Sequence, residues 1–235
     1  MEEYFVNEDK CNIISKLMDD KKNIIIYGED GVGKTEIIQR VLNKRKNDKI
    51  LYSRNSRTLK EALVSLTSYN SKNSSVFRKE SILSLKKLLY DFINNVKVEY
   101  IIFDHVGVVE PMYYSFFSNI IFDRKIPLIV LSRGLEKNDI GLLRLVLFDF
   151  QKMKISNLSR LKADLLTSYF IEKYKINVND VDSFKKEIYH FSKGNIKVIK
   201  DLCYFATKAR YQKNGYINLR MINIDRKINW TMFNL

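Results

Sequence analysis

The sequence predicts an α/β fold, in which a parallel sheet with helices on both faces is followed by a small all-helical domain. Three observations lead to this prediction. Short apolar runs alternate with segments of helical periodicity over residues 1–155, which is typical of a parallel sheet. A glycine-rich loop connects the first apolar run to an amphipathic segment. From Leu158 onward the patterns are helical, so we place a boundary near Ser156 and expect domains of residues 1–155 and 156–235.

The glycine-rich loop meets the pattern G-x-x-x-x-G-K-[ST] of the phosphate-binding, or Walker A, loop of P-loop NTPases. Glycines let backbone N–H groups approach and surround a polyphosphate. We expect Lys34 to reach the β- and γ-phosphates and the Thr35 hydroxyl to bind Mg²⁺. The sequence therefore predicts a site for a nucleoside triphosphate, formed by Gly28, Glu29, Asp30, Gly31, Val32, Gly33, Lys34 and Thr35.

The context of the loop supports this interpretation over a fortuitous glycine turn. Residues 23–27 form a short apolar run before the loop, and residues 36–42 have helical spacing of their apolar positions after it. The motif requires this order of strand, loop and helix. The positive end of the helix would favour a bound anion.

The remaining elements follow from the same patterns. The segments with helical spacing in the first domain are residues 13–18, 36–42, 59–66, 82–96, 112–122 and 140–147, and those in the second are 161–174, 181–191 and 196–209. The predicted strands are residues 23–27, 49–53, 99–104, 126–132 and 153–155. We expect a mobile surface loop at residues 67–80, because Ser and Asn dominate there. Residues 216–235 show no clear period and are left unassigned.

A second candidate site residue, Asp104, closes the apolar run of residues 99–104. The carboxyl ends of parallel strands meet at one edge of a sheet, so we expect Asp104 to lie beside the phosphate-binding loop. A carboxylate there would hold Mg²⁺ together with Thr35, as in a Walker B motif. The alternative is an ordinary charged strand end.

The charge of the chain is strongly positive. Its formal net charge is +14, and residues 156–235 contain 15 Lys and Arg residues against 7 Asp and Glu residues. Such an excess suggests a polyanionic partner, most simply nucleic acid. A biased base composition is the alternative, because the whole chain is rich in Lys, Asn and Ile.

Membrane insertion and export are not indicated. The chain starts with an acidic segment, and no apolar stretch approaches the roughly eighteen residues that a membrane span needs. We therefore expect a cytoplasmic protein. Cys11 and Cys203 lack metal-ligand spacing and are expected to be buried, reduced thiols.

At this point the chain resembles the AAA+ ATPase superfamily, in particular the branch of origin-recognition proteins, helicase loaders, transposition ATPases and STAND-type ATPases. The resemblance covers most of the chain. It rests on the phosphate-binding loop, on Asp104 and on the turn of residues 192–197. Residues 5–8 lie where the group often has an aromatic-x-x-Arg-Glu approach to its first helix, although Asn7 replaces the Arg. The resemblance implies an ATP hydrolase that forms rings or filaments.

The resemblance also assigns roles to single residues. Ser132 falls at the sensor 1 position, whose side chain orients the attacking water or contacts the γ-phosphate. Arg144 lies where the family carries the arginine finger that acts on a neighbouring subunit's nucleotide, and Arg133 competes for this role. Lys197 takes the place of the sensor 2 arginine, which keeps the charge near a phosphate but loses the bidentate geometry.

One departure from the family concerns the residue after Asp104. The family usually has Glu there, as the base that polarises the attacking water, whereas this chain has His105. An imidazole could accept a hydrogen bond from water, since its usual pKa lies near 6.5. The alternative is a structural histidine, with Glu110 as a distant substitute base. We therefore expect slow hydrolysis.

Three function classes remain open. The first is an AAA+ ATPase that assembles on double-stranded DNA, with Lys72, Arg78 and Lys79 as candidate phosphate contacts. The second is a STAND-like nucleotide switch that recruits a protein partner without nucleic acid. The third is a small-molecule phosphotransferase, which the all-helical second domain argues against. ATP is favoured over GTP, because no Asn/Thr-Lys-x-Asp motif follows Ser132. The aromatic residues Tyr204, Phe205, Tyr211 and Trp230 are expected in the core more than at bases.

Overall fold

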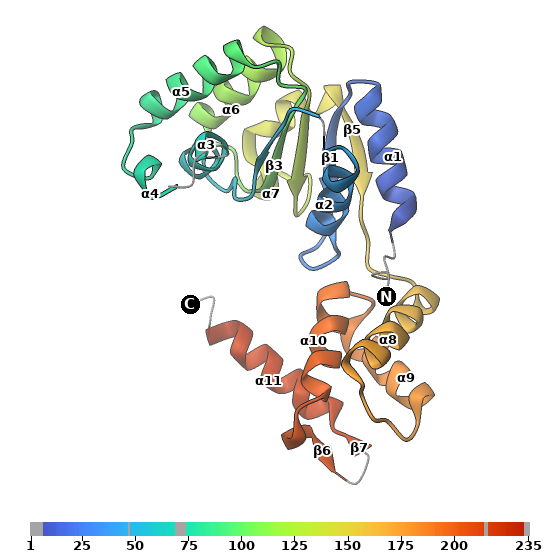
Figure 1. The fold of residues 1–235 in the computed structure, drawn as a ribbon. Coiled ribbons are helices and arrows are strands. Elements are labelled where there is room, and N and C mark those ends of the chain that lie inside the picture. Colours follow the sequence, from blue (N-terminus) through green and yellow to red (C-terminus); the bar gives the residue numbers. More distant parts are fainter. Residues whose placement is uncertain (1–6, 47, 69–73, 214–215, 233–235) are drawn as a thin grey trace. The chain divides into compact units, whose positions relative to one another are not determined.

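The structure, a computed structural model, describes residues 7–46, 48–68, 74–213 and 216–232 (Figure 1). These residues form two compact units. The first, an α/β unit, contains residues 8–30 and 34–155, and the second, a helical unit, contains residues 156–232 with Asn7 and Gly31–Gly33. Among the described residues, no helix has the length and apolar character needed to cross a bilayer.

The α/β unit is built on a parallel sheet of five strands. The order of the strands is β2-β3-β4-β1-β5, and each neighbouring pair is parallel. The prediction of a parallel α/β sheet is therefore confirmed. The strands are β1 (Asn23–Tyr27), β2 (Ile50–Ser53), β3 (Tyr100–Val106), β4 (Leu128–Ser132) and β5 (Phe150–Lys154).

Helices connect the strands, as the helical spacing predicts. They are α1 (Glu8–Asp19), α2 (Lys34–Lys44), α3 (Leu59–Thr67), α4 (Ser74–Phe77), α5 (Ile82–Asn95), α6 (Pro111–Ser118) and α7 (Lys137–Ile140). A π-helical turn, η2 (Asn119–Asp123), extends α6, and a 3₁₀ segment, η3 (Gly141–Asp149), follows α7.

Alternate residues of each strand supply the two faces of the sheet, because successive strand side chains point to opposite sides. Ile25, Phe103 and Val130 belong to one apolar cluster with buried residues of α3, α5, α6 and η3. Ile24 and Ile26 are fully buried but lie outside this cluster, as do the buried residues of α1 and α2. Helices therefore cover both faces, as expected.

Two local predictions differ from the structure. The stretch of residues 67–80 contains the short helix α4, where we expected only a loop. The predicted helix of residues 140–147 is a 3₁₀ segment, and the chain bends at Gly141, whose φ is +53°. A Cβ atom at Gly141 would lie 2.6 Å from the carbonyl oxygen of Val109, so this close backbone approach requires glycine and interrupts the helix.

The helical unit contains α8 (Arg160–Tyr174), α9 (Val181–Ser192), α10 (Ile196–Ala206) and α11 (Leu219–Met232). A 3₁₀ turn, η4 (Ala209–Tyr211), and a small hairpin of β6 (Gln212–Lys213) and β7 (Tyr216–Ile217) join α10 to α11. Polar N-caps fix the helix starts, since Asp180 accepts a hydrogen bond from Ser183 N and Asn195 accepts one from Val198 N. The unassigned C-terminal stretch thus contains a long helix.

Both cysteines are buried free thiols, as expected. Cys11 lies in α1 and donates a weak hydrogen bond to the carbonyl oxygen of Ile37 in α2, whereas Cys203 lies in the core of the helical unit. Burial raises the pKa of Cys203 to about 12, so this thiol stays protonated.

The aromatic core under α6 provides a test of the fold. Phe117 is fully buried, with its ring centroid 4.8 Å from that of Phe103 and 4.7 Å from that of Tyr113. We expect Phe117→Ala to lower the free energy of unfolding by about 3–5 kcal/mol, because it removes apolar contacts and leaves a cavity. Urea denaturation measures this loss. The matched control is Phe122→Ala, because Phe122 is 47% exposed. An equal loss of unfolding free energy in both variants would contradict the described core.

Candidate functional site

The phosphate-binding loop runs from the end of β1 into the first turn of α2, which begins at Lys34. Gly31 and Gly33 have φ values of +84° and +94°, a conformation that residues with a side chain rarely adopt. The glycine spacing of the motif therefore matches a backbone requirement. Since the first N–H groups of a helix have no partner within the helix, the start of α2 offers donors to an anion.

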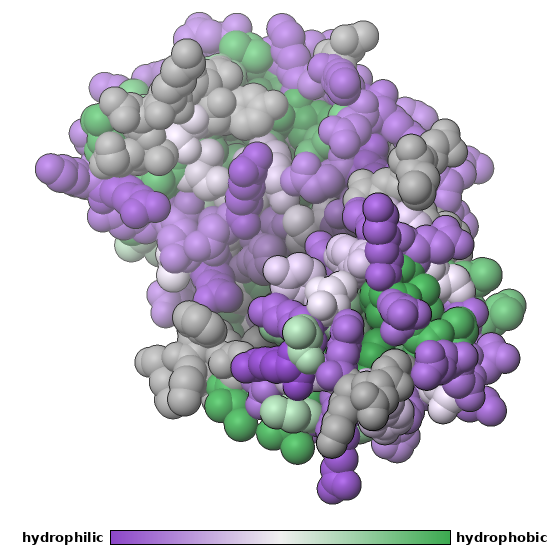
Figure 2. Space-filling model, turned by 60° about the horizontal axis from the view of Figure 1, so that its bottom comes forward, coloured by the Kyte–Doolittle hydropathy of each residue, from purple (hydrophilic) through white to green (hydrophobic). Residues whose placement is uncertain are grey.

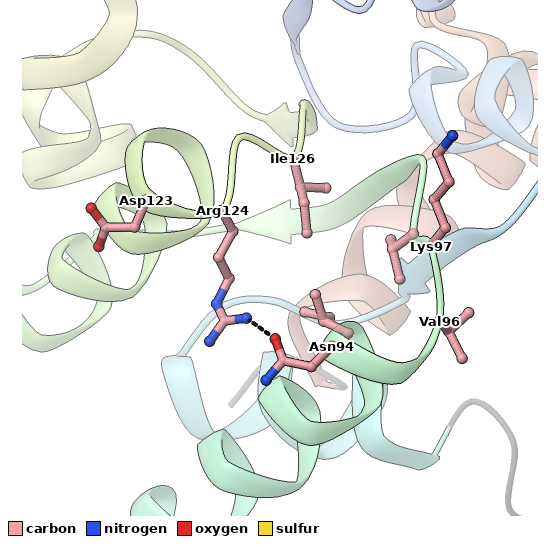
Figure 3. Close-up of a pocket in the computed structure, with 8 residues that line it drawn as sticks. Asn94, Val96, Lys97, Asp123, Arg124 and Ile126 are labelled. Atoms are coloured by element: carbon pink, nitrogen blue, oxygen red, sulfur yellow. Dashed lines mark hydrogen bonds between the residues drawn. The ribbon is translucent and has the colours of Figure 1, made fainter.

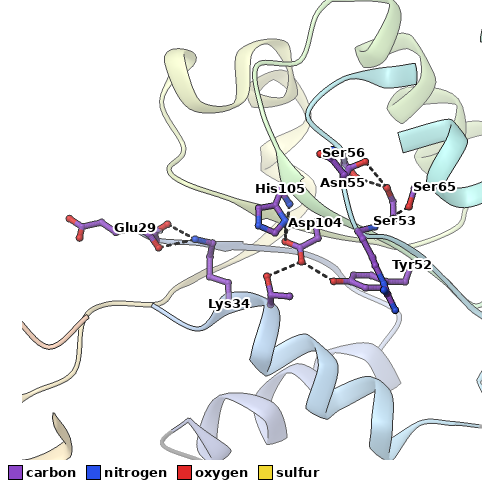
Figure 4. A network of polar contacts seen from close by, with 12 residues as sticks. Glu29, Lys34, Tyr52, Ser53, Asn55, Ser56, Ser65, Asp104 and His105 are labelled. Atoms are coloured by element: carbon purple, nitrogen blue, oxygen red, sulfur yellow. Dashed lines mark hydrogen bonds and ion pairs between the residues drawn. The ribbon is translucent and has the colours of Figure 1, made fainter. Parts of the chain in front are cut away.

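The Lys34 side chain folds back over the loop that precedes it (Figure 4). Its Nζ donates to the carbonyl oxygen of Gly28 at 2.7 Å and to that of Glu29 at 2.9 Å. Burial lowers the pKa of Lys34, while Asp30 and Asp104 act in the opposite direction. The ammonium group is thus held at the loop, where a phosphate oxygen could replace the carbonyl oxygens as its partner. The Glu29 side chain is exposed.

The Asp104 carboxylate is the centre of the site. Its side chain is 2% exposed, and Oδ2 accepts hydrogen bonds from Thr35 Oγ1 at 2.9 Å and from the Tyr52 hydroxyl at 2.8 Å (Figure 4). Burial alone would raise the pKa of Asp104, but the hydrogen bonds from His105, Tyr52 and Thr35 outweigh it and hold the pKa below its usual value. The carboxylate is therefore ionised at neutral pH.

Thr35 and Asp104 form a donor set that fits Mg²⁺. A threonine hydroxyl and a carboxylate are hard oxygen ligands, and they lie within hydrogen-bonding distance of each other. Mg²⁺ is usually held by one or two carboxylates together with substrate phosphates and water, and not by an all-protein cage. Thr35, at the end of the loop, and Asp104, in β3, satisfy this requirement.

His105 has an unusual backbone conformation that changes the course of β3. Its φ is +58°, which is uncommon for a residue other than glycine. The register slips here, because Phe103 pairs with Val130 while Val106 pairs with Ser132, so that β3 carries one extra residue. Such a β-bulge re-aims side chains. Contrary to the prediction, Asp104 therefore lies within β3 and not at its end.

The His105 imidazole is bound to the carboxylate that precedes it. Nδ1 lies 3.1 Å from Asp104 Oδ1, and the backbone N–H of His105 donates to the same oxygen at 2.8 Å. The hydrogen bond to Asp104 raises the pKa of His105, and one to the backbone of Arg54 adds to this effect. Nδ1 is engaged with the carboxylate and the raised pKa favours the protonated imidazole, which cannot accept a water proton, so the contacts favour the structural interpretation of His105.

Tyr52 is a member of the site that the sequence analysis missed. It lies in β2, where it pairs with Ile102 of β3, and its side chain is nearly buried. Burial and the Asp104 carboxylate raise the pKa of Tyr52, so the hydroxyl stays a donor. The sequence contains a signal for this contact, since Tyr52 places a phenolic hydroxyl within a short apolar strand.

The loop after β2 is also tied to Asp104. Ser56 N donates to the main-chain carbonyl oxygen of Asp104 at 2.9 Å, and the Tyr113 hydroxyl of α6 donates to the carbonyl oxygen of Ser56 at 3.1 Å. Ser56 Oγ also donates to Ser53 Oγ at 2.7 Å (Figure 4). These bonds link the backbone around Asp104 to α6.

Ser132, the predicted sensor, ends β4 between β1 and β3. It pairs with Tyr27 of β1 and Val106 of β3, so the sheet places it between the two motif-bearing strands. Its side chain is 2% exposed, and its hydroxyl donates to the carbonyl oxygen of Gly134 at 2.8 Å. The hydroxyl would have to leave this bond to contact a nucleotide.

The other predicted residues lie outside the hydrogen bonds around Asp104 in the described part of the chain, but two of them are close to the loop. The positive charge of Arg133 lowers the pKa of Lys34, and Lys197 N donates to the carbonyl oxygen of Gly31 at 3.0 Å. Arg133 follows β4 and Arg144 lies in η3, and both are exposed. Glu110 is the exposed residue before α6, Arg78 and Lys79 follow α4, and Lys197 lies in the first turn of α10 in the helical unit. Lys72 lies outside the described residues. The roles predicted for these residues stay predictions.

A pocket of about 390 Å³ lies elsewhere on the α/β unit (Figure 3). It is lined by Val98 and Ile126, which precede β3 and β4, and is therefore at the sheet end opposite Asp104. Two cationic side chains, Lys97 and Arg124, line it, and Arg124 stacks on Tyr90 and donates to Asn94 at 2.9 Å. Arg124 thus has a structural role there.

Comparison with solved structures identifies the fold. The structure of the Orc1 protein of Aeropyrum pernix in complex with DNA superposes with a TM-score of 0.69 at 11% sequence identity, covering 93% of this chain and 64% of that one. A signal transduction ATPase with numerous domains (STAND) with a tetratricopeptide repeat sensor, from Pyrococcus horikoshii, gives a TM-score of 0.53 at 15% identity, covering 96% of this chain and 33% of that one. The chain therefore has the same fold as these two proteins.

Both similarities were expected from the sequence, which resembles these two branches of the superfamily. At 11% and 15% identity they establish the fold alone. The chain spans less than two thirds of the length of either AAA+ protein. No protein-family model matches the sequence, and no curated protein does.

The ion pair at the centre of the site predicts a measurable histidine titration. We expect Asp104→Asn to lower the pKa of His105 toward 6.5, because the variant removes the carboxylate that raises it. Imidazole ¹H–¹⁵N NMR across a pH series measures this shift. His190, the other histidine of the chain, lies in α9 of the helical unit, so its resonances are assigned separately from those of His105. An unchanged His105 titration would contradict the described pairing.

Proposed function

We propose that the chain binds ATP with Mg²⁺, hydrolyses it slowly and assembles on double-stranded DNA in a nucleotide-dependent way. The observation that carries the nucleotide part is the hydrogen bond of Thr35 to Asp104, which joins a phosphate-binding loop to a buried, ionised carboxylate. In this proposal residues 1–155 form the ATPase domain and residues 156–235 form the lid.

Each residue of the site has a defined task in this proposal. The N–H groups of the loop surround the phosphates, and Lys34 exchanges the carbonyl oxygens of Gly28 and Glu29 for phosphate oxygens. Thr35 and Asp104 hold Mg²⁺, which neutralises phosphate charge. Ser132 and Lys197 act as sensors of the γ-phosphate.

Slow turnover follows from His105. A fast hydrolase needs a base that accepts a hydrogen bond from the attacking water. The His105 imidazole is bound to Asp104, and this pairing raises its pKa, so it is protonated over more of the neutral pH range than a free histidine. ATP then serves mainly to hold an assembled state.

Assembly is supported by the surface around Arg144. On the same 3₁₀ segment, η3, the side chains of Leu145 and Phe148 are 59% and 80% exposed. On a 3₁₀ segment, side chains three residues apart lie on the same face, and an apolar patch left exposed there is typical of an interface with another protein. In this proposal η3 contacts a second copy of the chain, and Arg144 reaches the nucleotide of that copy, with Arg133 as the alternative cation.

DNA binding is supported by charge and by fold. The net charge of +14 favours a polyanion, and Arg78 and Lys79 are exposed next to the Ser- and Asn-rich stretch. The Aeropyrum pernix protein of the same fold was solved in complex with DNA. The second candidate function is a STAND-like nucleotide switch that works without nucleic acid. The pairing of His105 with Asp104 fits this function as well as it fits the first, and the similarity to the STAND structure supports it.

The phosphate-binding loop is tested by Lys34→Ala. We expect this variant to lose binding of a fluorescent ATP analogue, because it removes the ammonium group that contacts the β- and γ-phosphates. Lys46→Ala, an exposed lysine beyond the end of α2, is the matched control and should bind as the wild type does. Equal binding by both variants would show that the loop is not the nucleotide site.

Turnover across a salt series separates the two functions. If the chain assembles on DNA, we expect double-stranded DNA to stimulate ATP hydrolysis at low salt and the stimulation to fall as salt rises, since phosphate contacts release counterions. The measurement is phosphate release with and without duplex, with Asp104→Ala as the inactive control. Turnover that is independent of DNA at every salt concentration would favour the protein-recruiting switch.

A further inference from the structure

The helical unit carries an exposed aromatic surface that the ATPase proposal does not use. It consists of Tyr174, the last residue of α8, and Tyr204, in the last turn of α10, together with Lys173, Lys175 and Lys208. We call these five residues the tyrosine ledge. Figure 2 shows one face of the molecule, on which hydrophilic side chains dominate and smaller apolar areas lie between them.

The rings of the ledge form a continuous series with the core below. Phe170, which is buried, stacks on Tyr174 with a centroid distance of 5.4 Å and an interplanar angle of 8°. Tyr174 meets Tyr204 edge to face at 6.0 Å, and Tyr204 meets Phe205 at 5.7 Å. The ring of Tyr204 is therefore held in position by its neighbours.

Tyr204 differs from the other rings of this series in its exposure. Phe170 belongs to the core of the helical unit, and Tyr174 and Phe205 pack against that core, whereas Tyr204 belongs to neither group and is 51% exposed. The expectation that Tyr204 is a core residue is therefore wrong. The half-exposed ring keeps accessible aromatic surface that a partner can contact.

One lysine lies at the exposed ring, and two more, Lys173 and Lys175, flank Tyr174 in the sequence. The Lys173 ammonium donates to the Tyr169 hydroxyl at 3.2 Å. The Lys208 ammonium lies 5.6 Å from the centroid of Tyr204 and 4.8 Å from that of Phe205. Within residues 172–175 and 204–208, three lysines accompany a single acidic residue, Glu172. Cations at the ends of α8 and α10 also suit the helix dipoles, but that effect does not account for an ordered ring left in water.

We propose that the tyrosine ledge is a binding site for single-stranded nucleic acid, in which an unpaired base stacks on Tyr204 and the lysines contact the neighbouring phosphates. Aromatic rings next to lysines are the common means of holding a single strand without sequence preference. A duplex cannot use such a site, because its bases are already stacked and paired. The site lies within the helical unit and does not depend on the ATPase proposal.

Fluorescence anisotropy with a labelled oligothymidylate of about 12 nucleotides tests the ledge, since single-strand sites span about 4–16 nucleotides. We expect Tyr204→Leu to weaken binding roughly 5- to 150-fold, the effect of losing one stacked base, and Tyr204→Phe to retain it. The matched control is Tyr216→Leu, because Tyr216 is 62% exposed on β7 and should not contribute. Equal thermal unfolding of the variants excludes misfolding.

Two further arms separate stacking from charge. An abasic strand of the same length should bind more weakly than oligothymidylate, and Lys208→Gln should reduce the salt slope of log K by about 0.7. All these binding measurements are repeated with Lys34→Ala and without ATP, so the result for the tyrosine ledge does not depend on whether the chain binds a nucleotide. Equal affinity of wild type and Tyr204→Leu, equal binding of the abasic strand, or no binding at low salt would overturn the proposal and leave the ledge as a protein contact.

Discussion

The buried charge of Asp104 is the constraint on which the described site depends. A carboxylate that is 2% exposed is costly to ionise unless hydrogen bonds replace the water that it loses. Three elements supply those bonds: Thr35 from the start of α2, Tyr52 from β2, and His105 from β3 itself. Because each donor comes from a different part of the α/β unit, the carboxylate fixes the position of α2 against the sheet.

The same constraint limits the chemistry that we propose. The bulge in β3 and the positive φ of His105 let the imidazole turn back on Asp104, where it stabilises the ionised carboxylate. In our proposal, a histidine used in this way supports metal and nucleotide binding at the expense of water activation. In our proposal the nucleotide therefore acts more through the state that it stabilises than through the rate of its hydrolysis.

The sequence predicts those features that depend on local patterns. The positive φ values of Gly31 and Gly33 favour glycine at these positions, and burial explains the apolar runs of the strands. The loop and the sheet could therefore be predicted from the sequence. The contact of Tyr52 with Asp104 joins residues 52 positions apart, and the bulge at His105 depends on pairing with β4. The exposure of Tyr204 depends on how α8 and α10 pack, because helical spacing alone assigns it to the core.

The most direct test of the central claim is the Mg²⁺ dependence of ATP affinity, measured by calorimetry in the wild type and in Asp104→Asn. Our account predicts that Mg²⁺ tightens ATP binding by the wild type, because Thr35 and Asp104 hold the ion against the phosphates. In Asp104→Asn, the ratio of the ATP dissociation constants without and with Mg²⁺ should fall close to one. An equal ratio in both proteins, or no binding of ATP by the wild type, would contradict the account.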